Sequence, residues 1–174
     1  AWSTTYGAAV EWFQGIFAFR AGVFDMSATP AGALSPLGAQ LDSTFSQQQF
    51  VGEIEERHQL WGQPGKLKIT GFLIHGRMGD FQGAVALSQP GQPFAGDPSD
   101  ALVSVRDYRL RPGVSLNMEQ QVSETFGVFA RAGWADGNVE PWDNTDIDRT
   151  VEAGVSMIGK DWGRPNDTIG FAGV

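Results

Sequence analysis

The feature that most constrains this chain is a regular alternation of apolar and polar residues, repeated along most of its length. In the segment 5–13, Ala8, Val10 and Trp12 would share one face of a β-strand, whereas Glu11 would lie on the other. The same two-residue period predicts strands at 5–13, 16–24, 47–60, 66–73, 114–121, 128–134, 151–158 and 168–174. In every predicted strand except 47–60, the more apolar face carries no charged residue. The pattern therefore predicts an all-β protein of about eight strands.

The exception, 47–60, has charges on both of its predicted faces. Glu53, Glu55 and Arg57 would lie on the polar side, but Glu56 and His58 fall on the side of Phe50 and Ile54.

The connections between the predicted strands are short and long in turn. Short turns are expected near 14–15, 61–65, 123–126 and 160–167, and long connections at 26–45, 77–110 and 135–148. Outer-membrane barrels have this asymmetry, with short periplasmic turns and long extracellular loops. Within the second long connection, the apolar piece 81–87 is expected to be briefly helical and to fold inward, narrowing a pore.

A face without charge suits contact with lipid, because Arg or Lys near the middle of a bilayer costs such barrels about 2–4 kcal/mol. No apolar run reaches the roughly 18 residues typical of a membrane-spanning helix. Strand length and loop asymmetry favour an antiparallel up-and-down transmembrane β-barrel, with residues 1–174 in a single barrel domain. A β-sandwich, whose strands also alternate, is the alternative.

Composition excludes several other classes. The net charge is -8 and the basic residues do not cluster, which argues against nucleic-acid binding. The chain has no cysteine, so it has neither disulfides nor thiolate metal ligands.

Catalytic and metal-binding patterns are weak. His58 and His75 lack a matching triad pattern, and the pair Glu53 and Glu55, about 6.8 Å apart along a strand, is the only hint of glycosidase chemistry. The loop residues Asp143, Asn144, Asp146 and Asp148 resemble a sparse calcium loop without the glycine and distal glutamate of an EF-hand. We therefore predict no enzyme activity, no cofactor and no metal site, with calcium in the loop 136–148 left open.

Four segments resemble the carbohydrate-selective porin family of the OprB type. They are VGEIEERH at 51–58, GVFARAGWADG at 127–137, TDIDR at 145–149 and WGRPND at 162–167. The resemblance covers nearly the whole chain. It implies a sixteen-stranded barrel in the bacterial outer membrane that admits sugars by passive diffusion. About eight strands would be half of such a barrel, and an end inside a strand and the absence of a leader are expected of a partial chain.

The polar faces supply candidate pore-lining and sugar-contacting residues. They are Arg20, Glu53, Glu55, Arg57, Glu119, Phe129, Arg131 and Glu152. Arginine donors and glutamate acceptors match sugar hydroxyls, and a phenylalanine face can stack on a pyranose ring. The alternative is that these charges pair across the wall and only stabilise it.

The expected partners are mono- or small oligosaccharides and outer-membrane lipid. Two other functions stay open: a closed eight-stranded outer-membrane barrel with a structural or adhesive role, and a soluble sugar-binding sandwich. The particular sugar, and whether the protein is a monomer or a homo-oligomer, are not determined by the sequence.

Overall fold

The structure is a computed structural model that describes residues 4–27, 44–142 and 147–174. Its eight strands form one antiparallel sheet in chain order. The strands are β1 (Thr4–Gln14), β2 (Phe17–Met26), β3 (Gln48–Leu60), β4 (Gln63–Met78), β5 (Asp107–Gln121), β6 (Phe126–Ala135), β7 (Arg149–Gly159) and β8 (Arg164–Gly173). The all-β prediction and the up-and-down topology are confirmed.

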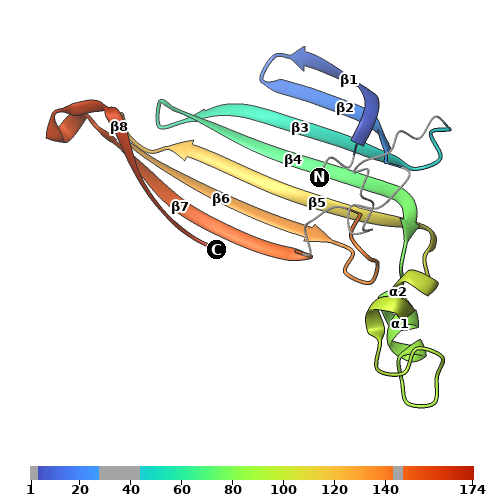
Figure 1. Cartoon of the computed structure of the whole chain (residues 1–174). Coiled ribbons are helices and arrows are strands. Elements are labelled where there is room, and N and C mark those ends of the chain that lie inside the picture. Colours follow the sequence, from blue (N-terminus) through green and yellow to red (C-terminus); the bar gives the residue numbers. More distant parts are fainter. Residues whose placement is uncertain (1–3, 28–43, 143–146) are drawn as a thin grey trace.

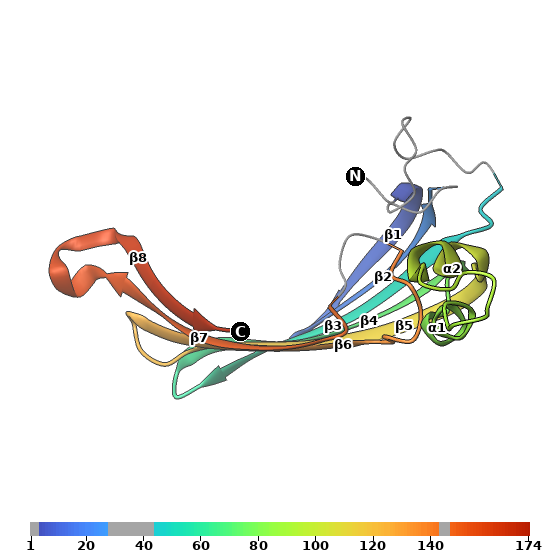
Figure 2. The same cartoon turned by 60° about the horizontal axis from the view of Figure 1, so that its bottom comes forward.

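The sheet is an open, curved wall (Figures 1 and 2). β1 and β8 are its two edges and do not pair with each other. The alternative of a closed eight-stranded barrel is therefore wrong for the described residues. The sandwich is wrong as well, because the described strands belong to a single sheet and no second sheet packs against it.

Short turns join the strands at one end of the sheet. In the β3–β4 hairpin, Leu60 pairs with Gln63 across the two residues Trp61 and Gly62. Both have positive φ, 53° and 76°, as a type I′ turn requires. The β7–β8 connection is a single 3₁₀ turn, Lys160–Trp162. At the opposite end, β2, β4 and β6 end and β3, β5 and β7 begin, so the long connections leave from there (Figure 1).

Three strands begin at least three residues earlier than predicted: β4 at Gln63, β8 at Arg164 and, most clearly, β5 at Asp107. Pro112 was expected to precede β5 but lies inside it, paired with Leu73 of β4. Its carbonyl accepts from the Asp136 N–H, and a strand residue points its N–H and C=O to the same side. The missing N–H of Pro112 therefore points past the end of β6, where it removes no bond from the β4–β5 ladder.

The prediction of a helix at 81–87 is confirmed. α1 (Phe81–Leu87) begins at Asp80, whose side chain accepts from the Gly83 N–H. A second helix that was not predicted, α2 (Pro98–Ser104), is capped in the same way by Asp97. Neither helix in the described part of the chain is long and apolar enough to cross a membrane.

The inward folding expected of 81–87 is not observed. In both views, α1 and α2 lie together beyond the ends of β4 and β5 and do not cover the concave face of the sheet (Figures 1 and 2). Backbone bonds to the β6–β7 connection hold the base of this helical pair: the Phe81 N–H donates to Asn138, and the Glu140 N–H donates to Gly79. The two connections are thus tied together at the rim.

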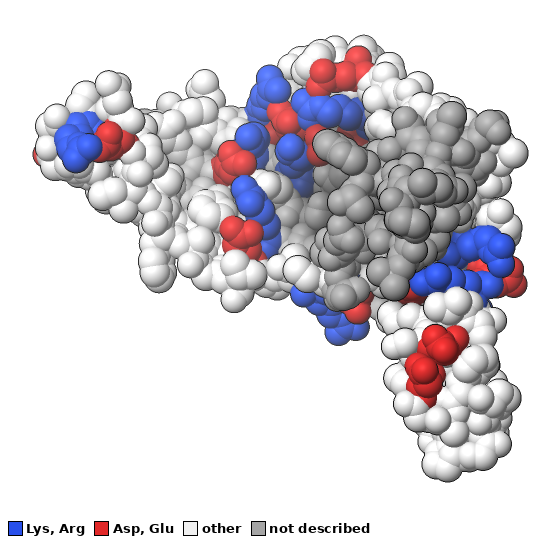
Figure 3. All heavy atoms as spheres, in the orientation of Figure 1, with Lys and Arg blue, Asp and Glu red and all other residues white. Residues whose placement is uncertain are grey.

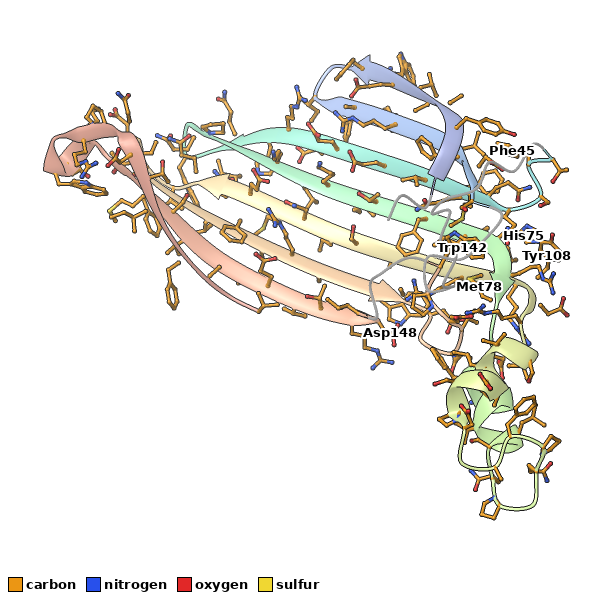
Figure 4. All side chains as sticks on the ribbon, in the orientation of Figure 1. Phe45, His75, Met78, Tyr108, Trp142 and Asp148 are labelled. Carbon is orange, nitrogen blue, oxygen red and sulfur yellow. The ribbon has the colours of Figure 1, made fainter. Side chains whose placement is uncertain are left out.

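The segment that packs on the concave face is instead part of the β6–β7 connection. Trp142 is 1% exposed and contacts Met26, Ile74 and Met78 in a small apolar cluster, and Figure 4 shows it beside Met78. Gly76 makes room for it, because a Cβ there would lie 3.1 Å from the indole ring.

Candidate functional site

The two faces of the sheet differ sharply in chemistry. Apolar side chains on the convex face are largely exposed, including Val10 at 66% and Phe171 at 78%. Charged side chains form a band across the concave face (Figure 3). Since side chains alternate along each strand and paired residues share a face, the cross-strand register identifies the residues of this band.

The first part of the band is a network centred on Arg20 of β2. Arg20 lies between Glu11 of β1 and Glu53 of β3 in the register. Its Nε donates to Glu11 at 2.5 Å, and its Nη1 donates to Glu53 at 2.7 Å and to Glu55 at 2.8 Å. One guanidinium therefore holds three carboxylates from two neighbouring strands.

The carboxylates of this network are satisfied from the β3–β4 side as well. Glu53 also accepts from the Thr70 hydroxyl at 2.8 Å, and Lys68 lies 3.7 Å away. Glu55 also accepts from Arg57 Nε at 2.6 Å, and its side chain is only 7% exposed. We call Glu11, Arg20, Glu53, Glu55, Lys68 and Thr70 the Arg20 network. Its donors and acceptors are mostly occupied by one another.

The second part of the band lies on β4–β7 and is more open. Lys66 pairs with Glu119 at 3.0 Å. Arg131 lies 3.7 Å from Glu152, with its side chain 49% exposed. We call Lys66, Glu119, Phe129, Arg131 and Glu152 the Arg131 group.

Phe129 has a defined position in this group. Its ring fills the space over Gly154 of β7, where a Cβ would lie 2.5 Å from the ring. The guanidinium of Arg131 stands 5.3 Å from the ring centroid, close enough for a cation–π contact. A hollow of about 1000 Å³ is lined by Phe129, Arg131, Lys66 and Glu119 among others.

The structure thus divides seven of the eight predicted pore-lining residues into two sets. Arg20, Glu53 and Glu55 belong to the Arg20 network, and Glu119, Phe129, Arg131 and Glu152 belong to the Arg131 group. Arg57 lies between the sets: it binds Glu55 but its side chain is 59% exposed and lines the hollow. Lys66, Lys68 and Thr70 were not selected from the sequence, although their place on the polar face of 66–73 was a usable signal.

The irregular charges of β3 lie on the convex side. Glu56 and His58 contact each other at 2.7 Å, and His58 contacts Gln120 of β5 at 3.0 Å. All three lie toward the short-turn end of the sheet, and Gly65 leaves the space that His58 and Gln120 occupy. The middle of the convex face therefore stays free of charge.

The rim of the long connections is held by ion pairs. Arg106 donates to Glu140 through two nitrogens, at 2.8 and 2.5 Å, and this contact raises the pKa of Arg106 above its ordinary value. Arg111 donates to the Asp136 carbonyl and to the Asp148 carboxylate. These bonds fix the ends of the β6–β7 connection.

The loop 136–148, for which calcium binding was left open, belongs to this same connection. Asp143, Asn144 and Asp146 lie outside the described residues, and Asp148 is engaged by Arg111. Among the residues that the structure describes, no group of acidic or histidine side chains could hold a metal ion.

Comparison with known proteins agrees with this architecture. Residues 1–174 match the family described as carbohydrate-selective porin, OprB family. A search of curated proteins found no match. Among solved structures, the chain resembles OprB from Pseudomonas putida at high pH, with a TM-score of 0.67 and 16% sequence identity. The similarity covers 94% of this chain and 38% of that chain; at this identity it concerns the fold.

Proposed function

Since the chain belongs to the carbohydrate-selective porin family of the OprB type, we propose that it forms part of the wall of a passive channel for mono- or small oligosaccharides. Membership indicates a channel rather than an enzyme, and it places the protein in the outer membrane. The chain spans 38% of the length of the solved relative, so the activity proposed here is that of the complete protein.

The observation that carries this proposal is the two-faced wall. Its convex face presents exposed apolar side chains, which a bilayer covers, and its concave face presents arginine, lysine and glutamate. Sugars bear hydroxyl groups that both donate and accept hydrogen bonds. A wall of alternating charged donors and acceptors can exchange such bonds with a solute as it moves, without holding it tightly.

The two parts of the charged band have different roles in this proposal. The Arg20 network stabilises the wall, because its carboxylates are already bound by protein donors. The Arg131 group contacts the sugar, because Arg131 is half exposed and its ion pair with Glu152 is long. Arg57 acts with it from β3, on the same hollow.

Phe129 serves the sugar indirectly. One side of its ring lies against Gly154 and the guanidinium of Arg131 stands near it. The ring thereby orients the planar donors of Arg131, whose fixed geometry suits adjacent hydroxyls better than a lysine ammonium does.

The test is uptake by liposomes that contain the intact porin. Swelling in glucose should be faster than swelling in a neutral non-sugar solute of similar size. No swelling in either solute would contradict a channel, and equal rates in both would contradict selectivity for carbohydrate.

A further inference from the structure

The convex face carries two exposed arginines at one end of the sheet. Arg77 is the penultimate residue of β4 and Arg149 is the first residue of β7. In the register both fall on the apolar side of the wall, in the alternation of Leu73 and of Val151. Both lie at the end from which the long connections leave, which is the extracellular end in outer-membrane barrels.

Each of these arginines is directly opposite an exposed aromatic residue. Arg77 pairs with Tyr108 of β5, and Arg149 pairs with Trp134 of β6. Tyr108 is 48% exposed and stacks on His75, and Trp134 is 44% exposed. The same combination thus occurs on two separate strand pairs at the same rim. Tyrosine and tryptophan favour the level of lipid headgroups, where one part of the ring is apolar and the other is wet.

Within the described residues, neither Arg77 nor Arg149 forms an ion pair. Most of the other arginines do, namely Arg20, Arg57, Arg106, Arg111, Arg131 and Arg164. Two described carboxylates near them have other partners: Asp107 accepts from the backbone N–H of Tyr108, and Asp148 binds Arg111. At a rim that contacts lipid, the phosphate group of a lipid is a suitable partner for an exposed guanidinium.

We propose that the pairs Arg77–Tyr108 and Arg149–Trp134 are two contact points for phosphate groups of lipopolysaccharide in the outer leaflet. A guanidinium matches phosphate with two parallel hydrogen bonds. We assign these contacts to the outer leaflet because both pairs lie at the end of the sheet from which the long connections leave. At the short-turn end, the charged cluster on the convex face of β3 contains Glu56 and His58, and the exposed Arg164 is already bound to Asp167. The two rims therefore differ in the lipid that they can bind.

The experiment measures binding of purified lipopolysaccharide to the intact porin in detergent. Arg77→Gln and Arg149→Gln should each weaken binding about fivefold, and the double variant should weaken it roughly twentyfold or more, the effect of a basic side chain at a charged membrane surface. Arg164→Gln is the matched control, because it removes an exposed arginine from the other rim, and it should leave binding unchanged. Dephosphorylated lipopolysaccharide should bind the parent protein only as weakly as the double variant binds the native lipid.

Three outcomes would overturn the proposal. The first is equal affinity of the parent and double variant. The second is equal binding of phosphatidylglycerol and lipopolysaccharide by the parent, which would mean that any anionic lipid suffices. The third is a double variant with altered oligomeric state and unaltered lipid affinity, which would make this rim a contact between copies. Glucose-driven swelling of liposomes should be unchanged in all variants, so the result is independent of the channel proposal.

Discussion

The arginines on the concave face differ in how much of their hydrogen-bonding capacity the protein itself uses. Arg20 binds three carboxylates at 2.5–2.8 Å, whereas Arg131 has one carboxylate at 3.7 Å. Both arginines are flanked by residues of the same alternating pattern, so the sequence predicts the same polar face for both and does not distinguish their roles. Their surroundings separate a residue that stabilises the wall from a residue that can meet a solute.

Replacing Arg131 should therefore affect solute binding and leave assembly intact. We expect Arg131→Ala to weaken sugar binding by about 1–2 kcal/mol, which is the loss of one or two hydrogen bonds from a charged donor. Liposome swelling in glucose, compared with a neutral non-sugar of similar size, measures this effect. Equal rates for the variant and its parent in both solutes would make Arg131 a structural wall residue paired with Glu152.

Replacing Arg20 should have the opposite profile. Arg20→Ala leaves Glu11, Glu53 and Glu55 close together without their shared donor, and like charges that lie side by side destabilise the folded state. The temperature at which the folded barrel unfolds in detergent should fall, while Arg131→Ala leaves it unchanged. A variant as stable as its parent would show that the network contributes nothing to the wall.

At the scale of elements, the β6–β7 connection, and not the β4–β5 connection, contributes a buried side chain to the concave face. Trp142 packs on the concave side of β4, and Arg106 and Glu140 join the two connections. The helices α1 and α2 stay at the rim. The segment that lies on the concave face is therefore fixed by packing of one tryptophan over Gly76, which local helix propensity does not reveal.

Removing this tryptophan should loosen the connection. We expect Trp142→Ala to destabilise the packed cluster by about 3–5 kcal/mol and to raise the conductance of the open channel in planar bilayers. Trp61→Ala is a suitable control because Trp61 lies in a hairpin turn and is 81% exposed. Unchanged conductance in Trp142→Ala would mean that this segment does not narrow the lumen.

The short turns offer a test by pH. Lys160 donates to Glu124 at 2.7 Å, and this hydrogen bond lowers the pKa of Glu124. Because the folded-state pKa is the lower one, the contact stabilises the turns above the ordinary glutamate pKa of about 4.3 and is lost as pH falls through the lowered value. Spin labels in both turns should become more mobile as pH falls through this lowered value, and not at pH 6, and Glu124→Gln should remove this dependence. A parent with the same mobility below this value and at pH 6 would contradict it.

For the whole molecule, the central expectation is that the convex face contacts lipid. Phe19, Ile69, Leu116 and Val155 all lie on that face in the register. Spin labels at these four positions should be quenched by a lipid-soluble reagent. Quenching of most of them only by an aqueous reagent would contradict the membrane orientation.

A charge test complements the labels. Ile69→Lys should destabilise the barrel by about 2–4 kcal/mol because the ammonium would face hydrocarbon. Thr70→Lys, one residue further on, faces the concave side and should cost less. Equal losses of stability would show that the two faces are not in different solvents.

The sequence by itself determined the strands, their alternation, the side of the wall on which most charges lie, and the family. These properties follow from a period of two and from short turns, which are local. Even the helix at 81–87 could be predicted, because its residues and its cap at Asp80 are contiguous.

Tertiary structure decided what depends on neighbours distant in sequence. The start of β5 before Pro112 depends on where β6 ends. His58 is accommodated on the convex face because it contacts Gln120 of β5 and lies over Gly65 of β4. The different hydrogen bonding of Arg20 and Arg131 depends on which carboxylates the cross-strand register brings within reach. A residue's face is encoded in its own segment, whereas its partners, and with them its freedom to bind a solute or a lipid, are set by the pairing of strands.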